Sequence, residues 1–132
     1  MGVPGLEGFA ARAAADGEWN LTARFWTGAI AVTVGSDATV IHLDDGHLTA
    51  VEQTTAPAAV ATNPGPTDIT IAAPAEVWAA MLEDPPRAHY NDLQAAQYHH
   101  GLEIGGDELT KYQYYPALRR LLELARAEQN GG

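Results

Sequence analysis

The stretch IHLDDGHLTAV, residues 41–51, decides the fold because it predicts a tight β-hairpin in the middle of the sequence. Asp45 and Gly46 favour a two-residue primed turn, in which both central residues have positive φ. A turn at these residues places Leu43 opposite Leu48. The same register gathers apolar side chains on one face of the hairpin, the face expected to meet a core: Ile41, Leu43, Leu48 and Ala50.

The opposite face of this hairpin carries His42, Asp44 and His47, with Asp44 opposite His47 and His42 opposite Thr49. Two imidazoles and a carboxylate are ligands that zinc and copper accept in proteins. These side chains lie at a hairpin tip, however, where the pattern implies no pocket. We therefore interpret the cluster as a turn and expect no metal there.

The residues around the hairpin predict further strands and then helices. Residues 24–34 alternate between two faces, which is typical of a strand, and residues 54–67 are rich in Thr, Ala, Pro and Gly and predict a loop. The other expected elements are a helix over 5–15, a strand over 68–72, a helix from Pro74 to Leu82, a helix over 90–99, a strand over 102–104 and a helix over 108–127. Hairpin-linked strands followed by helices indicate an α+β fold, in which helices cover one face of an antiparallel sheet.

Composition and charge restrict the function. The 132 residues predict a single domain over 1–132, with a core over about 20–126, a short N-terminal helix and a frayed C-terminal tail. A net charge of −10 repels phosphate backbones, so we expect no nucleic acid partner. The sequence has no cysteine, no long apolar run and no signal-peptide start, which favours a cytoplasmic protein without stable membrane insertion. The high share of Ala, and of Arg over Lys, is consistent with a bacterial gene of high GC content.

Three short motifs occur in a fixed order. The strand Asp68-Ile69-Thr70-Ile71 precedes a helix with Trp78, and GLEIGGD at residues 101–107 precedes the last helix. Upstream, DGHLTAV at residues 45–51 forms the second half of the hairpin. Their order and spacing over residues 20–126 resemble the sterol carrier protein type two family. Each motif is weak alone, and the resemblance rests on their combination.

The resemblance implies a five-stranded antiparallel sheet with helices covering one face and an apolar pocket between them. It implies a small soluble carrier that holds an apolar or amphipathic small molecule, such as a lipid, sterol or acyl chain, without a cofactor. An enzyme partner or a homodimer is consistent with this role. The acidic charge departs from the basic members of the family and argues against transfer between anionic membranes.

Candidate ligand-binding residues are the aromatic and aliphatic side chains of the first strand and of the helices: Phe25, Trp26, Trp78, Leu82, Tyr112, Tyr115, Leu118 and Leu122. Pockets are mostly apolar with a few polar groups, which this set fits. The tyrosines suggest a smaller, partly oxygenated ligand. The alternative interpretation is that these residues form an ordinary core.

A second function stays open, in which the same pocket belongs to a biosynthetic enzyme of the cyclase, isomerase or hydrolase type. His89, His99 and His100 lie close to tyrosines in the sequence and could act as acid or base. His89 also lies three residues before Asp92, a spacing that lets two side chains meet on a helix. No nucleophile elbow, P-loop or zinc motif accompanies them, so we assign no catalytic residue.

Overall fold

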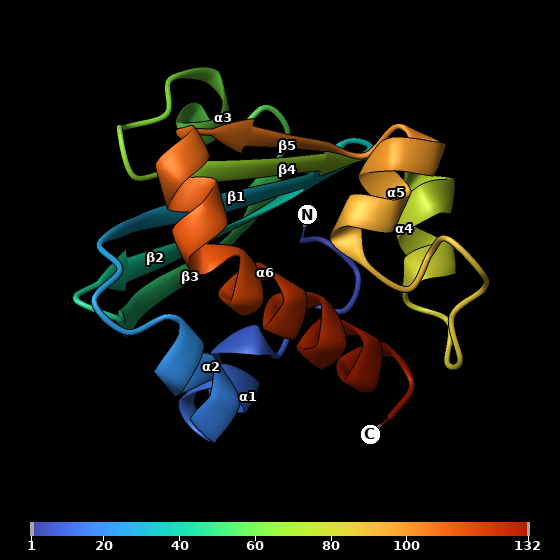
Figure 1. Cartoon of the computed structure of the whole chain (residues 1–132), viewed down its shortest axis with the longest axis horizontal. Helices are drawn as coiled ribbons and strands as arrows, with labels where there is room; N and C mark the ends of the chain where they lie inside the picture. The colour runs from blue at the N-terminus through green and yellow to red at the C-terminus, as the bar shows by residue number, and fades with distance from the viewer. Residues whose placement is uncertain (1, 132) are drawn as a thin grey trace.

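A computed structural model of the chain, which describes residues 2–131, shows one five-stranded sheet with helices packed against it (Figure 1). The strands follow the order β3-β2-β1-β4-β5 across the sheet. Their bounds are β1 Gly28–Val34, β2 Asp37–Asp44, β3 His47–Thr55, β4 Ile69–Ala73 and β5 Glu103–Gly106. The α+β class and the number of strands are as predicted.

The sheet is mostly antiparallel, but its central pair is not. β1 and β4 run parallel, with Ile30 opposite Ile69 and Val34 opposite Ala73. The chain leaves the outer strand β3, passes through the short helix α3 (Ala59–Thr62) and returns beside β1. This crossover lies within the segment predicted as a plain loop, and it is why β4 has the direction of β1.

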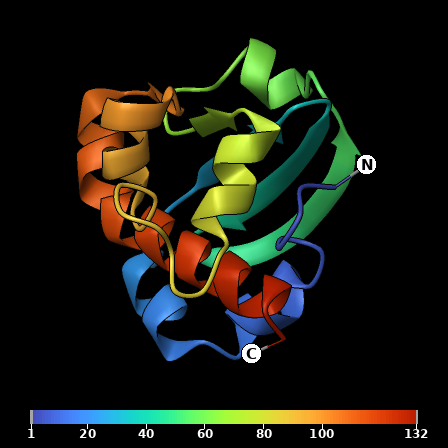
Figure 2. The same cartoon turned by 90° about the vertical axis from the view of Figure 1, so that its right-hand side faces the viewer.

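The helices differ from the prediction mainly at the N-terminus. The helix expected over residues 5–15 corresponds to a shorter helix over Phe9–Ala14, and a second short helix over Gly17–Thr22 was not predicted. Asp16 caps this second helix by accepting a hydrogen bond from Trp19 N at 2.7 Å. The helical bounds are α1 Phe9–Ala14, α2 Gly17–Thr22, α4 Ala75–Met81, α5 Leu93–His100 and α6 Glu108–Gln129. Figures 1 and 2 show α1, α2, α4, α5 and α6 on one side of the sheet, with α3 apart from them.

The hairpin between β2 and β3 has the predicted turn. Asp45 and Gly46 both have positive φ, at 51° and 81°, and Leu43 pairs with Leu48. The register then shifts by one residue, so His42 lies opposite Ala50 rather than Thr49. Because of this bulge, Val51 rather than Ala50 packs against the core.

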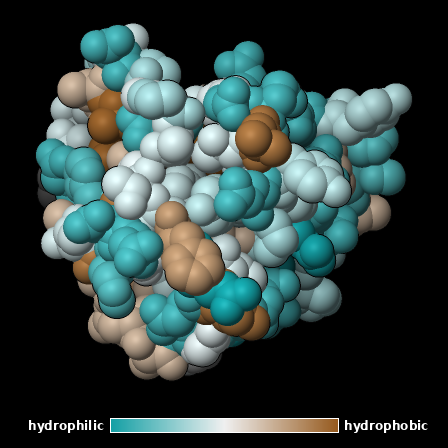
Figure 3. Space-filling model, turned by 60° about the vertical axis from the view of Figure 1, so that its left-hand side comes forward, coloured by the Kyte–Doolittle hydropathy of each residue, from teal (hydrophilic) through white to brown (hydrophobic). Residues whose placement is uncertain are grey.

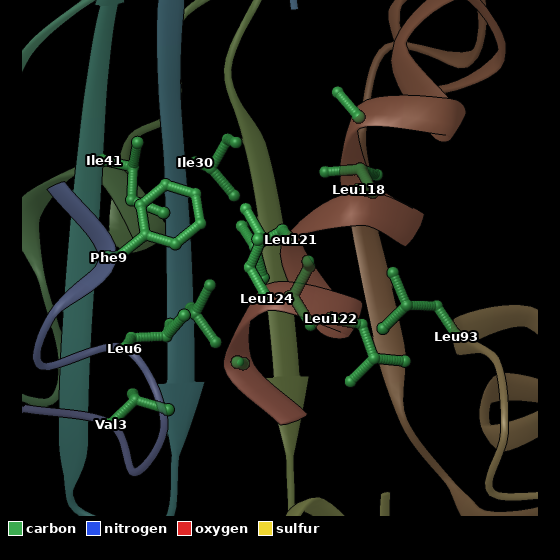
Figure 4. Close-up of a cluster of buried hydrophobic side chains, with 14 of the residues drawn as sticks. Val3, Leu6, Phe9, Ile30, Ile41, Leu93, Leu118, Leu121, Leu122 and Leu124 are labelled. Carbon is green, nitrogen blue, oxygen red and sulfur yellow. The ribbon is translucent and has the colours of Figure 1, made fainter. Parts of the chain in front are cut away.

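The main core lies between the sheet and the helices. Alternation in β1 sends Ile30, Val32 and Val34 into this core, while Ala29 and Ala31 face a smaller cluster under α3. From α6 the buried stripe comprises the expected Leu118, Leu121, Leu122 and Ala125. Figure 4 shows side chains from β1, β2, α6 and the N-terminal segment meeting there.

The long helix α6 connects the two ends of the molecule. Asp107 caps it as predicted, accepting a hydrogen bond from Thr110 N at 3.1 Å, and Pro116 lies inside it. Figure 1 shows the axis of α6 changing direction between its orange and red parts, which agrees with the bend expected for an internal proline. None of the helices within residues 2–131 has the length and apolar character needed to cross a bilayer.

Candidate functional site

The structure separates the eight predicted ligand-binding residues into three groups. Five lie buried in the core: Trp26, Trp78, Leu82, Leu118 and Leu122. Phe25 is 70% exposed, on a residue with φ of 70°, with the Arg24 guanidinium 5.4 Å from its ring centre. Only Tyr112 and Tyr115 line a hollow at the surface.

The two buried tryptophans have satisfied polar groups. Trp26 stacks on Tyr114 with ring centres 4.4 Å apart, and its indole nitrogen donates to Thr67 O at 2.9 Å. The Trp78 indole nitrogen donates to Pro4 O at 2.8 Å. Both rings therefore make the contacts of packed core residues.

The hollow is a groove of about 570 Å³ between α5, β5 and the first half of α6. Its volume falls within the range of small-molecule sites, about 300–1,000 Å³. The lining mixes aromatic or apolar side chains with polar ones: Gln94, Gln97, Ile104, Glu108, Lys111, Tyr112, Tyr115 and Pro116. We call it the α5–α6 groove.

Tyr115 fixes the distance between the two helices of the groove. Its hydroxyl donates to Asp92 Oδ1 at 2.9 Å and accepts a hydrogen bond from Gln94 N at 3.0 Å. Asp92 also caps α5 by accepting from Leu93 N at 2.9 Å. Burial, together with the hydrogen bond to Asp92, raises the pKa of Tyr115 above its usual value, so the phenol stays protonated.

The charged residues of the groove are paired. Lys111 Nζ lies 2.7 Å from Glu108 Oε1, one turn earlier on α6, and 3.5 Å from Ile104 O on β5. Glu108 itself is largely exposed. Because Glu108 balances Lys111, the groove presents hydrogen-bonding groups without a strong net charge.

The sequence pattern predicted only the two tyrosines of this groove. Gln94 and Gln97 lie three residues apart on α5, as Tyr112 and Tyr115 do on α6, so each helix presents one face. The i, i+3 spacing was visible in the sequence. What brings the two faces together is the position of α5 beside β5, which no local pattern encodes.

The histidine cluster lies outside the groove. The rings of His89 and His99 are 4.1 Å apart, and His100 stacks on Tyr90 at 3.9 Å. The spacing of His89 and Asp92 suggested a contact between their side chains. Instead, the Asp92 carboxylate accepts hydrogen bonds from the Tyr115 hydroxyl and from Leu93 N, and the His89 ring packs against His99. Burial, and then the nearby His99, lowers the pKa of His100.

The hairpin tip has the geometry of a turn. His42 Nε2 lies 3.0 Å from Glu52 Oε1 on the neighbouring strand, and Asp44 and His47 are exposed. Within residues 2–131, no three His, Asp or Glu side chains are arranged to hold a metal ion.

Exposed apolar side chains are scattered. Figure 3 shows brown and tan residues separated by teal and white ones on one face of the molecule. The large exposed hydrophobic residues are Leu21, Phe25, Tyr98, Leu109 and Tyr112. Single apolar residues of this kind are common on protein surfaces.

The fold just described is that of sterol carrier protein 2. A crystal structure of sterol carrier protein 2 superimposes with a TM-score of 0.70 at 17% sequence identity, over 92% of this chain and 93% of that one. The solution structure of a conserved hypothetical protein from Thermus thermophilus, described as possibly a sterol carrier protein, gives a TM-score of 0.61 at 19% identity, covering 95% and 83%.

A third solved structure, the ubiquinone synthesis protein UbiJ-SCP2, gives a TM-score of 0.50 at 17% identity, covering 96% of this chain and 89% of that one. Protein-family models give no match to this chain, and curated proteins give none either. The resemblance inferred from the motifs is thus confirmed at the level of the fold.

Proposed function

We propose that the protein is a small-molecule carrier that holds a neutral amphipathic ligand in the α5–α6 groove. The observation that carries this proposal is the groove itself, of about 570 Å³, where two tyrosines and Ile104 meet two glutamine side chains. Tyrosine rings offer flat apolar surface, and glutamine amides offer both a donor and an acceptor. The fold shared with sterol carrier protein 2 supports a binding role.

The charge of the molecule favours a neutral ligand. The chain carries a net charge of −10, which repels free anions, and Lys111 is already paired with Glu108. A ligand with a flat apolar body and one or two oxygen atoms matches both the tyrosine faces and the amides. An enzyme partner that receives the ligand and a homodimer both stay predictions, which sedimentation with and without ligand would test.

The test follows the side-chain amide signals of Gln94 and Gln97 by NMR while neutral amphipathic probes are added. We would use 1-naphthol, dodecanol and the quinone menadione, so that ring and chain ligands are compared. We expect saturable shifts of both amides with at least one probe. The same titration on Gln97→Trp, which fills the groove, should give at least tenfold weaker binding.

Gln113→Trp is the matched control, because Gln113 is exposed on α6 and does not line the groove. It should bind as the natural sequence does. Equal binding by the Gln97→Trp and Gln113→Trp variants would show that the probes bind elsewhere, and the proposal would then be wrong.

The enzyme alternative gains no support from the geometry, because the side chains of His89, His99 and His100 do not line the groove. A general acid or base must reach its substrate within hydrogen-bonding distance. We therefore propose binding alone.

A further inference from the structure

The connection between α4 and α5, residues 83–92, is joined to the end of α5 by two ring contacts. The centre of the His89 ring lies 4.1 Å from that of His99, and the Tyr90 ring stacks on the His100 ring with centres 3.9 Å apart. Figure 1 shows this connection as the yellow loop beside α4 and α5. Each contact uses an imidazole from the last turn of α5, and imidazoles change charge just below neutral pH.

The surroundings of His100 favour its neutral ring. Among the described residues its Nε2 has no hydrogen-bond partner, and this atom is shielded from solvent. An imidazolium carries a proton on both ring nitrogens, so charging His100 leaves a buried N–H without an acceptor. Burial, followed by the nearby positive charges of His99, His89 and Arg87, lowers the pKa of His100 below its ordinary value of 6.5.

Positive charge gathers at this end of α5 without a carboxylate to balance it. The Arg87 guanidinium lies 5.1 Å from the centre of the Tyr90 ring, the same ring on which His100 stacks. Glu83 is paired with Arg87 at 3.2 Å, and within residues 2–131 the only histidine in an ion pair is His42 on β2. The C-terminal end of a helix attracts cations weakly. Each proton added to the three imidazoles is nevertheless opposed by the cations already beside them.

The other charged groups of the adjoining elements have partners elsewhere or form no ion pair with these imidazoles. They are Asp84 in the connection, Glu76 in α4, Asp92 at the start of α5, Glu103 in β5, and Arg119 and Arg126 in α6. Asp92 lies 3.9 Å from Arg119 Nε, and Arg126 donates hydrogen bonds to Met81 O and Asn91 O. No carboxylate within residues 2–131 is therefore placed to hold the three histidines in their charged form.

The connection ends at Asp92, which links it to the α5–α6 groove. The Asp92 carboxylate accepts a hydrogen bond from the Tyr115 hydroxyl, and that hydroxyl accepts one from Gln94 N. The Gln94 N–H lies in the first turn of α5, where the helix itself offers no acceptor. Three residues before Asp92, His89 has a left-handed φ of 69°, which is unfavourable for a residue with a side chain. Release of the connection relieves this strain and moves Asp92 away from Tyr115.

We propose that residues 83–92 form a pH-dependent latch: when the imidazoles of His89, His99 and His100 become charged, the connection leaves the end of α5, the bond from Tyr115 to Asp92 breaks, and the groove releases its ligand. The part that concerns the ligand rests on the carrier function proposed above. The attached connection holds His100 neutral, so the released state binds more protons. Release is therefore favoured as pH falls below 6.5.

The first experiment measures hydrogen exchange of the Gln94 amide in the 15N-labelled protein from pH 7.5 to 5.0, corrected for the intrinsic pH dependence of exchange. This range stays above the usual pKa of carboxyl groups, so histidines are the side chains that change charge. We expect the protection of Gln94 to fall at least fivefold by pH 5.0, while Val32, buried in β1, keeps its protection. Constant protection of Gln94, or an equal fall at Val32, would overturn the proposal.

The second experiment repeats this measurement on His100→Phe and on the matched control His47→Phe. Phenylalanine keeps a ring against Tyr90 but takes no charge, whereas His47 is exposed at the hairpin tip. The protection of Gln94 should change less than twofold in His100→Phe and should fall as in the natural sequence in His47→Phe. An equal fall in both variants would show that His100 does not control the latch.

The natural sequence decides the question if His100→Phe does not fold. The ring Cε1–H signal of His100 should titrate below pH 6.5, with the same midpoint as the loss of protection at Gln94. A His100 ring that titrates without any change at Gln94, or with a different midpoint, would contradict the latch.

Ligand release is measured separately, with whichever of 1-naphthol, dodecanol and menadione binds at pH 7.5. Its affinity should fall at least fivefold at pH 5.0 for the natural sequence and stay within twofold for His100→Phe. A constant affinity while Gln94 loses protection would show that the latch does not control the groove, and the proposal would be wrong. If no probe binds at pH 7.5, the carrier proposal fails, and the exchange of Gln94 alone decides whether the latch exists.

Discussion

At the scale of single residues, Tyr112 and Tyr115 show how neighbours of one type take different roles. Tyr112 is 84% exposed, whereas Tyr115 is half-buried and bonded to the cap of α5. The sequence marked both as candidates and gave no means of ranking them. The difference arises from Asp92, which lies 23 residues away and becomes a neighbour only when α5 packs against α6.

Tyr115→Phe should therefore destabilise the protein. It removes one hydrogen bond to a carboxylate and one from Gln94 N, so the free energy of unfolding should fall by about 1–2 kcal/mol. Tyr112→Phe is the control and should change it by less than about 0.5 kcal/mol. Urea denaturation measures both, and equal effects would refute the role given to the Tyr115 hydroxyl.

The ion pair of Asp16 and Arg120 makes stability depend on pH. Arg120 donates to the two carboxylate oxygens of Asp16 at 2.6 and 2.9 Å. These hydrogen bonds, more than that from Trp19 N, lower the pKa of Asp16 below its ordinary value of 3.8, against the opposing effect of burial. The stabilisation is complete above the unfolded-state pKa and is lost as pH falls through the lower folded-state pKa.

Asp16→Asn keeps a capping side chain but removes the charge. At pH 6 it should lower the free energy of unfolding by about 1–2 kcal/mol, and the difference from the natural sequence should shrink toward pH 2. Denaturation across this range provides the measurement. A difference that stays constant with pH would mean that the charge of Asp16 does not contribute.

At the scale of elements, local patterns predicted most elements and some of their pairing. The Asp45–Gly46 turn is encoded by two adjacent residues and was correct. The register shift between His42 and Leu43 and the parallel pairing of β1 with β4 were missed, since each depends on what the strand meets across the sheet. The short helix α2 was missed because Trp19 is its only buried residue, so its six residues carry no helical periodicity.

Gly46→Ala should disturb the hairpin more than Gly101→Ala disturbs the end of α5. Both glycines have positive φ, 81° and 78°, so both substitutions cost about 1 kcal/mol of backbone strain. A Cβ at Gly46 would also lie 2.7 Å from Arg24 Cα, whereas one at Gly101 meets nothing within 4 Å. Thermal denaturation should show that Gly46→Ala lowers the free energy of unfolding by about 1–3 kcal/mol more than Gly101→Ala does. Equal decreases for the two variants would contradict the close contact between Gly46 and Arg24.

At the scale of the whole molecule, five of the eight residues that were predicted to bind a ligand form part of the core. Helical and strand spacing identify side chains that face inward, but they do not say whether the space between them is filled. Here Trp26, Trp78 and the leucines of α6 pack with Val3, Leu6 and Phe9 from a segment that was predicted to lie before the core. The groove that is lined by Tyr112 and Tyr115 lies on the surface.

The same core leads us to propose that the chain folds as one unit. Buried residues from Val3 to Ala125 form one cluster that includes all three tryptophans. Thermal unfolding followed by far-UV circular dichroism and by tryptophan fluorescence should therefore give coincident transitions. Two separated transitions would mean that part of the chain folds independently.

The carrier proposal is tested most directly by native mass spectrometry of the freshly purified protein, with the Gln97→Trp variant alongside. The account predicts a neutral small molecule bound to the 14.0 kDa chain and its absence from the variant whose groove is filled. Solvent extraction would then give the oxygen content of the ligand. A bare chain in both samples, together with no uptake of 1-naphthol, dodecanol or menadione, would contradict the proposal.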